Sequence, residues 1–135
     1  MTTKDQLTIL REEHRGIVQQ LRLVRRSLEA SRPGPQEKLH ESISELGSQL
    51  EAHFDHEERT LYGLLDSRLK RSSPTSELVK EHRAIQGALR TLQTMGAERA
   101  PAVQLEGQLS SLRSALNRHL EKEEKVVFWL ADYHL

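Results

Sequence analysis

The sequence predicts an all-α fold, an up-down-up-down four-helix bundle built from two repeated helix pairs. Three observations predict it. Four stretches carry apolar residues at alternating steps of three and four, breaks rich in proline, glycine and serine separate them, and the second half of the chain repeats the first. The alternating steps put the apolar residues on one face of a helix, and helices joined by short connections pack as antiparallel neighbours.

The breaks between the apolar stretches define the ends of the helices. Residues 31–35 contain two prolines flanking a glycine, a combination that cannot continue a helix. Residues 72–76 form a second break, and Gly96, with Pro101 after it, is expected to end the third helix. The predicted helices cover residues 4–31, 36–70, 76–95 and 102–131.

Polar residues interrupt each apolar series at steps where an apolar residue is expected. In the second helix the series runs from Leu50 to Leu61 and Leu64 across two polar positions. The six interruptions are His14, His53, Glu57, His82, His119 and Glu123. An imidazole or carboxylate buried without a partner costs several kcal/mol. These residues must therefore satisfy one another, hold water or bind a cation.

Two of the helices carry a histidine and a glutamate four residues apart, His53 with Glu57 and His119 with Glu123. Residues four apart lie one turn apart on the same helix face, so the two side chains of a pair converge on one point. The chain has no cysteine, and nitrogen and carboxylate donors without thiolate suit iron, manganese or zinc. The spacing therefore predicts a metal site.

An internal repeat indicates two metals. Residues 13–17, Glu-His-Arg-Gly-Ile, return 68 residues later as Glu-His-Arg-Ala-Ile, and the His-x-x-x-Glu pair returns 66 residues later. Two helix pairs related by a pseudo-two-fold axis bring their polar residues to the same level of the core. Each metal would take two histidines, with the two glutamates as bridges. Such bridges favour a redox pair such as iron or manganese, whereas zinc is commoner in mononuclear sites.

The charged neighbours of these residues are interpreted as surface groups. We expect His56 to face solvent or a neighbouring helix in preference to the metals. Glu58 and Glu124 are interpreted as solvated charges, with Glu124 as a substitute for Glu123 if the fourth helix were rotated. The run Arg11-Glu12-Glu13 is likewise interpreted as a solvated face.

The aromatic residues near the two pairs are interpreted as walls of the core. Tyr62 and Phe128 occupy matched positions of the repeat, and the Tyr62 hydroxyl is a candidate hydrogen-bond donor to an oxygen species on a metal. Phe128, Trp129 and Tyr133 also form an apolar cluster near the C-terminus, interpreted as exposed and able to support a homodimer.

The composition narrows the class of partner. Lys plus Arg and Asp plus Glu both number 20, so the formal net charge is zero and no charge excess attracts nucleic acid or a membrane surface. The absence of cysteine excludes disulfides, thiolate ligands and cysteine nucleophiles. The chain shows no signal segment and no membrane-spanning run. We expect one domain over residues 1–135, cytoplasmic, monomeric or homodimeric, with no nucleic-acid or membrane partner.

The ordered set His, His-x-x-x-Glu, His, His-x-x-x-Glu resembles the hemerythrin-like, HHE cation-binding family from His14 to Glu123. Residues 53–58, His-Phe-Asp-His-Glu-Glu, resemble the second-helix motif of that family. The resemblance implies a four-helix bundle around two iron ions, a non-haem pair that is usually oxo- or hydroxo-bridged. It implies terminal ligands at His14, His53, His82 and His119 and carboxylate bridges at Glu57 and Glu123.

The chain departs from the oxygen-carrying hemerythrins at two positions. Those proteins have a further histidine four residues after that of the third helix, where this chain has Gln86. They place the last carboxylate five residues after the final histidine, whereas the repeat here favours Glu123, at four. One nitrogen donor fewer implies a more open site, less suited to oxygen carriage. The bacterial HHE domains are the closer resemblance, and they imply oxygen or nitric oxide sensing, iron handling, or oxidative or nitrosative stress.

Three functional hypotheses follow, from different classes. The first is a di-iron protein that binds or senses dioxygen or nitric oxide. The second is a di-iron redox enzyme, such as a catalase-like consumer of peroxide, whose metals act as electron reservoir and Lewis acid. The third is a metal-free helical interaction module whose polar residues satisfy each other. Manganese and zinc are the less favoured metals, and whether the chain is an enzyme stays open.

Overall fold

The computed structural model describes residues 2–30, 37–69 and 75–134, and every regular element in these ranges is a helix. The elements are α1 (Thr3–Ala30), α2 (Glu37–Glu57), η1 (Glu58–Tyr62), α3 (Gly63–Leu69), α4 (Ser76–Ala97), α5 (Ala102–Lys122), η2 (Glu123–Val127) and α6 (Phe128–His134). The elements η1 and η2 are π-helical turns, and the residues that flank them keep helical backbone angles. Hence α2, η1 and α3 form one continuous rod, and α5, η2 and α6 form another.

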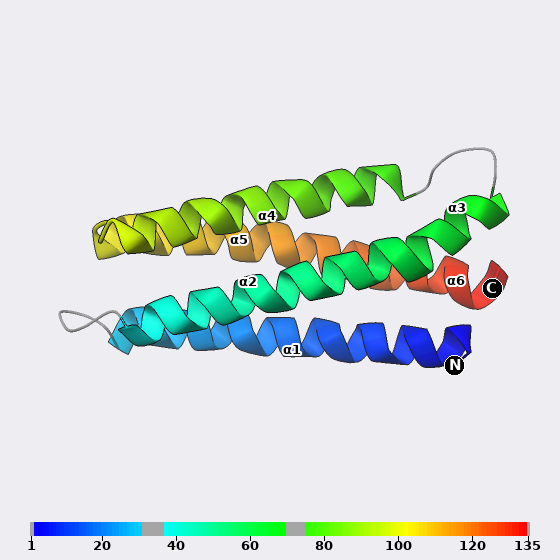
Figure 1. Ribbon diagram of the computed structural model, residues 1–135, viewed down its shortest axis with the longest axis horizontal. Coiled ribbons are helices and arrows are strands. Elements are labelled where there is room, and N and C mark those ends of the chain that lie inside the picture. Colours follow the sequence, from blue (N-terminus) through cyan, green and yellow to red (C-terminus); the bar gives the residue numbers. More distant parts are fainter. Residues whose placement is uncertain (1, 31–36, 70–74, 135) are drawn as a thin grey trace.

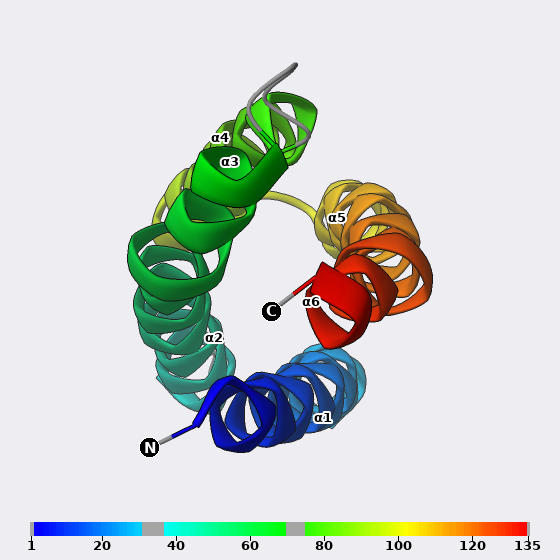
Figure 2. The same ribbon diagram turned by 90° about the vertical axis from the view of Figure 1, so that its right-hand side faces the viewer.

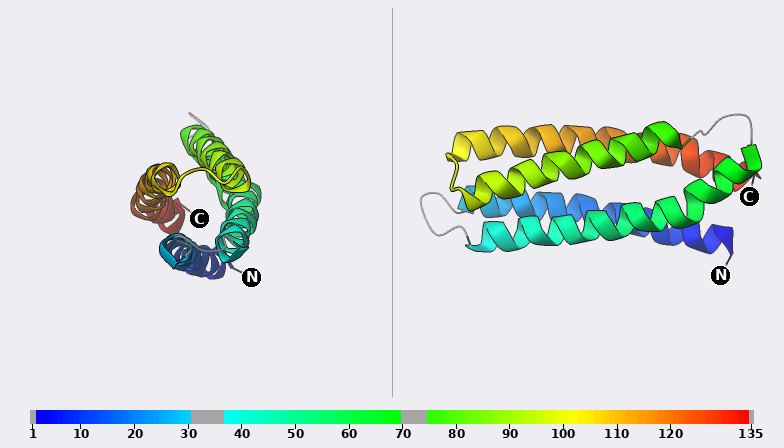
Figure 3. Two further views of the ribbon diagram at one scale, coloured as in Figure 1. Left: turned by 90° about the vertical axis from the view of Figure 1, so that its left-hand side faces the viewer. Right: turned by 45° about the horizontal axis from the view of Figure 1, so that its top comes forward.

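The four rods run alternately up and down, which confirms the predicted bundle (Figure 1). Seen end-on they form a ring in which α1 lies beside α2 and α5, and α4 lies beside the same two helices (Figure 2). Figure 3 shows the α1–α2 pair below the α4–α5 pair, with both chain ends at the same end of the bundle. Within the described ranges, no helix has an apolar stretch long enough to cross a membrane.

The third helix ends later than the sequence indicated. Gly96 was expected to end it, but α4 continues to Ala97 and Gly96 is an ordinary helical residue. Arg99 is the residue with a positive φ, 55°, and the N–H of Ala100 donates to the carbonyl of Met95 to close the turn. The left-handed residue at this end is therefore Arg99 and not the predicted glycine. The break predicted at 31–35 and residues 72–74 of the break predicted at 72–76 lie outside the described residues, and α4 begins at Ser76 as expected.

The core consists of two apolar clusters with a polar layer between them. The cluster toward the α4–α5 connection has contributions from all four rods and includes Ile17, Leu50, Ile85 and Leu116. The cluster at the end that carries the chain termini contains Leu7, Leu10, Leu61, Tyr62, Leu65, Leu78, Val127, Phe128 and Ala131. The six polar interruptions of the sequence pattern fall between the two clusters, each at most 2 % exposed. The bundle therefore encloses this polar layer in apolar surroundings on both sides.

A π-helical turn, η1, follows Glu57 and changes the register of the rod formed by α2, η1 and α3. After Glu57, the buried leucines are Leu61 and Leu65, each a step of four. Four residues turn an ideal α-helix by about 400°, so each such step drifts by about 40°. The wider turn of η1 offsets this drift. The prediction that Leu64 faces the core is therefore wrong, since Leu64 is 45 % exposed and Leu65 is 1 % exposed.

The same turn in the fourth rod decides which aromatic residues are exposed. Phe128 is fully buried, so the prediction that it belongs to an exposed cluster is wrong, because η2 rotates it toward the core. Trp129 and Tyr133 are exposed as predicted and stack on each other with ring centroids 5.8 Å apart. The side chains of Val126 and Leu130, predicted to face the core, are outside the described set.

Gly47 lets α2 and α4 pack closely. A Cβ atom at this position would lie 3.0 Å from Nε2 of Gln93 and 3.3 Å from Cδ2 of Leu89, both on α4. The Leu89 methyl group thus lies in space that an alanine methyl would crowd, although glycine inside a helix costs about 1 kcal/mol relative to alanine.

The register change predicts different costs for two adjacent leucines. Leu65→Ala should lower the free energy of unfolding by about 2–4 kcal/mol, because it leaves a cavity in the core. Leu64→Ala should lower it by less than about 1 kcal/mol, because that side chain is largely solvated. Urea unfolding of both variants measures the difference. Equal losses would show that the rod continues as an undistorted α-helix past Glu57.

Candidate metal centre

The structure brings the six predicted site residues together in one buried layer. Each rod contributes to it: α1 gives one histidine, α4 gives one, and each rod with a π-turn gives a histidine and a glutamate. The residues are His14, His53, Glu57, His82, His119 and Glu123. That they bind metal stays a prediction, which the geometry below supports.

The six residues form two groups that share both glutamates. The His14 group contains His14, His53, Glu57 and Glu123, and the His82 group contains His82, His119, Glu57 and Glu123. In each group, one ligand atom of every residue lies within 4.8 Å of the others. The histidine pairs are T-shaped, with ring centroids 4.6 Å apart in both groups. Each group is thus able to hold one metal ion.

Both shared glutamates approach histidines of both groups. Oε1 of Glu57 lies 3.2 Å from Nε2 of His53 and 3.3 Å from Nε2 of His82. Glu123 places Oε1 2.9 Å from Nε2 of His14 and Oε2 3.4 Å from Nε2 of His119. Each carboxylate therefore lies between the two groups, where a bridging ligand would lie.

Most atoms that face the centre of the layer have no hydrogen-bond partner. They are Nε2 of His14, His53 and His119, both carboxylate oxygens of Glu57 and Oε1 of Glu123. Buried polar atoms without partners are rare in folded proteins, and each calls for an explanation. Here the atoms are close neighbours that converge on common points. The donor set fits a pair of metal ions, since a cation at each point would satisfy all of them.

A glutamate on the outer side holds each of the four imidazole rings. The Nδ1–H of a ring donates to the carboxylate, in the pairs His53–Glu13 (2.7 Å), His119–Glu81 (2.7 Å), His82–Glu58 (2.8 Å) and His14–Glu124 (3.1 Å). A neutral imidazole that donates through Nδ1 has a lone pair on Nε2. The outer glutamates thus orient four lone pairs toward the centre, the arrangement typical of metal-bound histidines.

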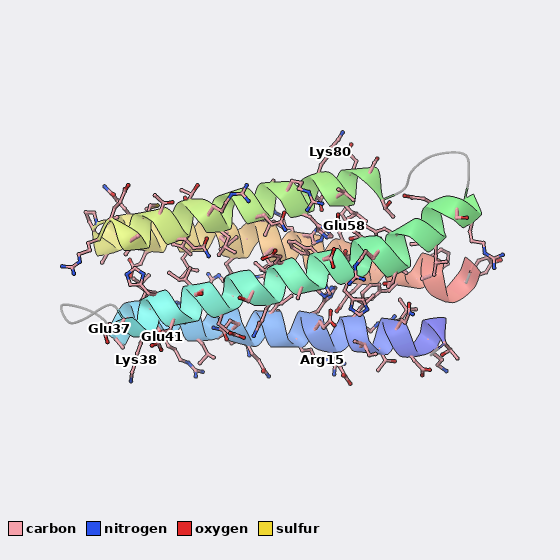
Figure 4. The ribbon with its side chains drawn as sticks, viewed as in Figure 1. Arg15, Glu37, Lys38, Glu41, Glu58 and Lys80 are labelled. Atoms are coloured by element: carbon pink, nitrogen blue, oxygen red, sulfur yellow. The ribbon has the colours of Figure 1, made fainter. Side chains whose placement is uncertain are left out.

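These outer glutamates were not predicted as site residues. Glu13, Glu58 and Glu124 were interpreted as solvated charges. Glu124 is exposed as interpreted, whereas Glu13 and Glu58 are partly buried. Each of the three accepts a hydrogen bond from a buried histidine, which was not predicted. Figure 4 shows Glu58 between its own rod and α4, whereas Arg15 and Lys80 lie on the outside of the bundle. The sequence signal that could have identified them is the repeat. It places a glutamate directly before the α1 and α4 histidines, His14 and His82, and another directly after Glu57 and Glu123.

His56 faces a neighbouring helix, which is the predicted alternative to metal binding. Its Nδ1 lies 3.1 Å from Oε2 of Glu13 on α1, the same carboxylate that holds His53. His56 belongs to neither of the two groups. It is therefore placed to share a hydrogen bond with an outer glutamate.

The structure also separates the two consecutive glutamates of the last motif. Glu123 is fully buried and belongs to both groups, whereas the Glu124 side chain is 48 % exposed and holds His14 from outside. Gln86 accepts a hydrogen bond from Nη1 of Arg83 at 2.9 Å and lines an outer cavity with Glu58. Its amide oxygen is thus engaged at the surface.

Aromatic rings cover the layer. Phe54 stacks on His82 with centroids 3.8 Å apart, and Phe128 stacks on His14 at 5.3 Å. Tyr62 packs against the other face of the site, 5.4 Å from the His82 ring. Both Tyr62 and Phe128 are buried, so their interpretation as core walls is confirmed. The Tyr62 hydroxyl additionally contacts Oε2 of Glu123.

Two small surface cavities border the layer on opposite pairs of helices. One, of about 280 Å³, lies between α1 and α2 and has His53 in its lining. The other, of about 460 Å³, lies between α4 and α5 and has His119 in its lining. They are related by the sequence repeat, since Gly16 and Ile17 of the first correspond to Ala84 and Ile85 of the second.

In the metal-free protein, the buried carboxylates favour the protonated forms of His14 and His82. Burial alone would lower the pKa of His14, but the carboxylates of Glu123 and Glu57 outweigh it and raise that pKa to about 10. The same balance raises the pKa of His82 to about 9. Burial raises the pKa of Glu123, but Glu57 and three imidazoles outweigh it and hold that pKa well below its ordinary value.

This balance predicts how the stability of the metal-free protein depends on pH. A histidine whose pKa is higher in the folded state stabilises the fold below its unfolded pKa of 6.5, and the stabilisation is lost as pH rises through about 9 to 10. The melting temperature of chelated protein should therefore fall across this range. A double variant, His14→Gln with His82→Gln, should show a smaller fall. A melting temperature that rises with pH would contradict this account.

The comparisons with known proteins agree with this geometry. The family model described as the hemerythrin HHE cation binding domain matches residues 5–131, a span that includes all six residues of the two groups. No curated protein and no solved structure matches the chain. The family match covers nearly the whole sequence, so this chain belongs to the hemerythrin HHE cation-binding domain family.

Proposed function

We propose that this chain is a non-haem di-iron protein that binds or senses dioxygen or nitric oxide. The observation that carries the proposal is the pair of buried donor groups that share both glutamates. Each group offers two imidazole nitrogens and two carboxylates, and most of these inward-facing atoms lack any other partner. Two metals bridged by Glu57 and Glu123 would satisfy both groups at once.

The chemistry of the donors favours iron. Imidazole nitrogens and carboxylate oxygens without thiolate exclude the soft-metal sites and suit iron, with manganese and zinc as alternatives. The outer glutamates make the imidazoles more basic by accepting their Nδ1–H bonds, and basic ligands stabilise the ferric state. Iron with few protein donors keeps open positions for oxygen-type ligands. A bound pair of iron ions would supply redox chemistry at the polar layer.

The surroundings of the layer favour a small ligand. Apolar clusters cover it on both sides, and Phe54 and Phe128 pack on its imidazoles. The cavities lined in part by His53 and His119 are the candidate approaches from outside. A diatomic molecule suits such a site better than a larger substrate, because all six donor residues are buried.

Elemental analysis with a visible spectrum tests the metal assignment. We expect two irons per chain and an absorption band of the oxidised pair that bleaches on anaerobic reduction. Glu57→Gln should reduce iron below one per chain, since Glu57 belongs to both groups. Glu51→Gln, an exposed position on the same helix, is the matched control and should keep both irons.

The reduced protein should then change its spectrum on addition of dioxygen or nitric oxide. A fully iron-loaded protein that responds to neither gas would contradict the binding function. Absence of metal after growth in iron-rich medium, together with full stability after chelation, would instead favour the metal-free interaction module.

A second candidate function is peroxide consumption. The observation that favours it is that the two groups contain equal numbers of imidazoles and share both carboxylates, so a peroxide could contact both metals at once. Iron-loaded protein would then consume peroxide through many turnovers, and Glu57→Gln would abolish this consumption while Glu51→Gln would not. Oxygen-electrode measurements with excess peroxide distinguish the two functions. A single stoichiometric turnover would rule out the enzyme.

A further inference from the structure

The two halves of the site differ in one aromatic residue that carries an oxygen. Tyr62 follows Glu57 by five residues, and Phe128 follows Glu123 by five. Both rings are buried, at 2 % and 0 % exposure. Tyr62 stacks on His82, the histidine from α4, and Phe128 stacks on His14, the histidine from α1. The repeat thus places a hydroxyl beside the His82 group and none at the matched position beside the His14 group.

The Tyr62 hydroxyl lies among the donor atoms of the His82 group. Its oxygen is 3.2 Å from Nε2 of His82 and contacts Oε2 of Glu123. Two donors bound to one metal at about 2.0–2.1 Å, at right angles to each other, lie about 3 Å apart. The separation of the phenol oxygen from His82 Nε2 is that of a hydrogen bond in the metal-free protein, and it also lies close to that of two ligands on one metal.

When the His82 ring is neutral, the phenol has a single hydrogen for two neighbouring acceptors. The Nδ1–H of His82 donates to Glu58 at 2.8 Å, so in the neutral ring Nε2 has only a lone pair. The carboxylate of Glu123 is also only an acceptor. The phenol has one hydrogen and lies within hydrogen-bond distance of both atoms, so its oxygen lone pairs and those of the two neighbours face a common point. A metal ion at this point would accept a lone pair from all three atoms.

We propose that Tyr62 is an oxygen ligand of the metal held by the His82 group, and that the metal of the His14 group, beside Phe128, keeps the open position for exogenous ligands. This inference rests on the proposed di-iron function. On metal binding the phenol O–H bond breaks, an oxygen–metal bond forms, and the proton leaves to solvent. No electron is transferred. Proton release is the usual companion of metal binding, and tyrosine oxygen is an established ligand for iron in proteins.

The chain allows a clean spectroscopic test because it contains only two tyrosines. Iron-loaded wild-type protein should show a phenolate-to-iron charge-transfer band, with tyrosine ring modes in the resonance Raman spectrum excited in that band. Tyr62→Phe should lose both features and retain two irons per chain. Tyr133→Phe, at the exposed tyrosine, is the matched control and should keep both features.

Mössbauer spectra of the same samples test the inequality of the two metals. Wild-type protein should show two iron environments of equal population, which become more alike in Tyr62→Phe. Two irons per chain without a phenolate band, or with a band that Tyr62→Phe leaves unchanged, would overturn this inference alone and reduce Tyr62 to a hydrogen-bond donor. Wild-type protein that does not bind two irons would overturn the di-iron function and this inference with it.

Discussion

The structure depends on four imidazole lone pairs that face two carboxylates across a dry layer of the bundle. Each ring gives its Nδ1–H to an outer glutamate, so a neutral ring presents a lone pair inward. Lone pairs of nitrogen and oxygen cannot satisfy each other, and in low-dielectric surroundings they repel. Positive charge inside the layer, from protons or metal ions, would relieve this repulsion. If the site binds metal, packing of the bundle and occupancy of the site would be linked, as they are in other proteins whose metal sites form on folding.

The π-turns reconcile this layer with the apolar packing beyond it. A histidine and a glutamate four residues apart converge inward, but continued steps of four would rotate the following leucines away from the core in an ideal α-helix. One wide turn directly after Glu57, and another beginning at Glu123, return the rods to register. The side chain of Thr60 donates to the carbonyl of His56 at 2.6 Å inside the first of these turns, which helps to satisfy the altered backbone. Turns of this kind are frequent at functional sites.

The sequence alone predicts the bundle and the six inner residues because both depend on local spacing. His14 and His53 interrupt their series at expected steps, and this can be recognised without knowing any contact. The outer glutamates could not be found in this way, since Glu124 and His14 are 110 positions apart and a charged run on a helix usually faces solvent. The burial of Leu65 in place of Leu64 was missed for another reason. The periodicity assumed one helical pitch throughout, and the pitch changes at the π-helical turn beside the site.

The two groups have the same kinds of donor residue but differ in the cations that lie beside their outer glutamates. Lys122 donates to Glu81 at 2.8 Å, and Arg83 pairs with Glu58, so cations partly neutralise both outer carboxylates that hold the His82 group. Arg15, matched to Arg83 by the repeat, is exposed on the outer face of α1 (Figure 4). A neutralised carboxylate is a weaker acceptor and makes its imidazole less basic. The His82 group would therefore give less electron density to a bound metal than its imidazole count suggests. An additional anionic oxygen is better accommodated there than at the His14 group, and this is the side on which the chain places the Tyr62 hydroxyl.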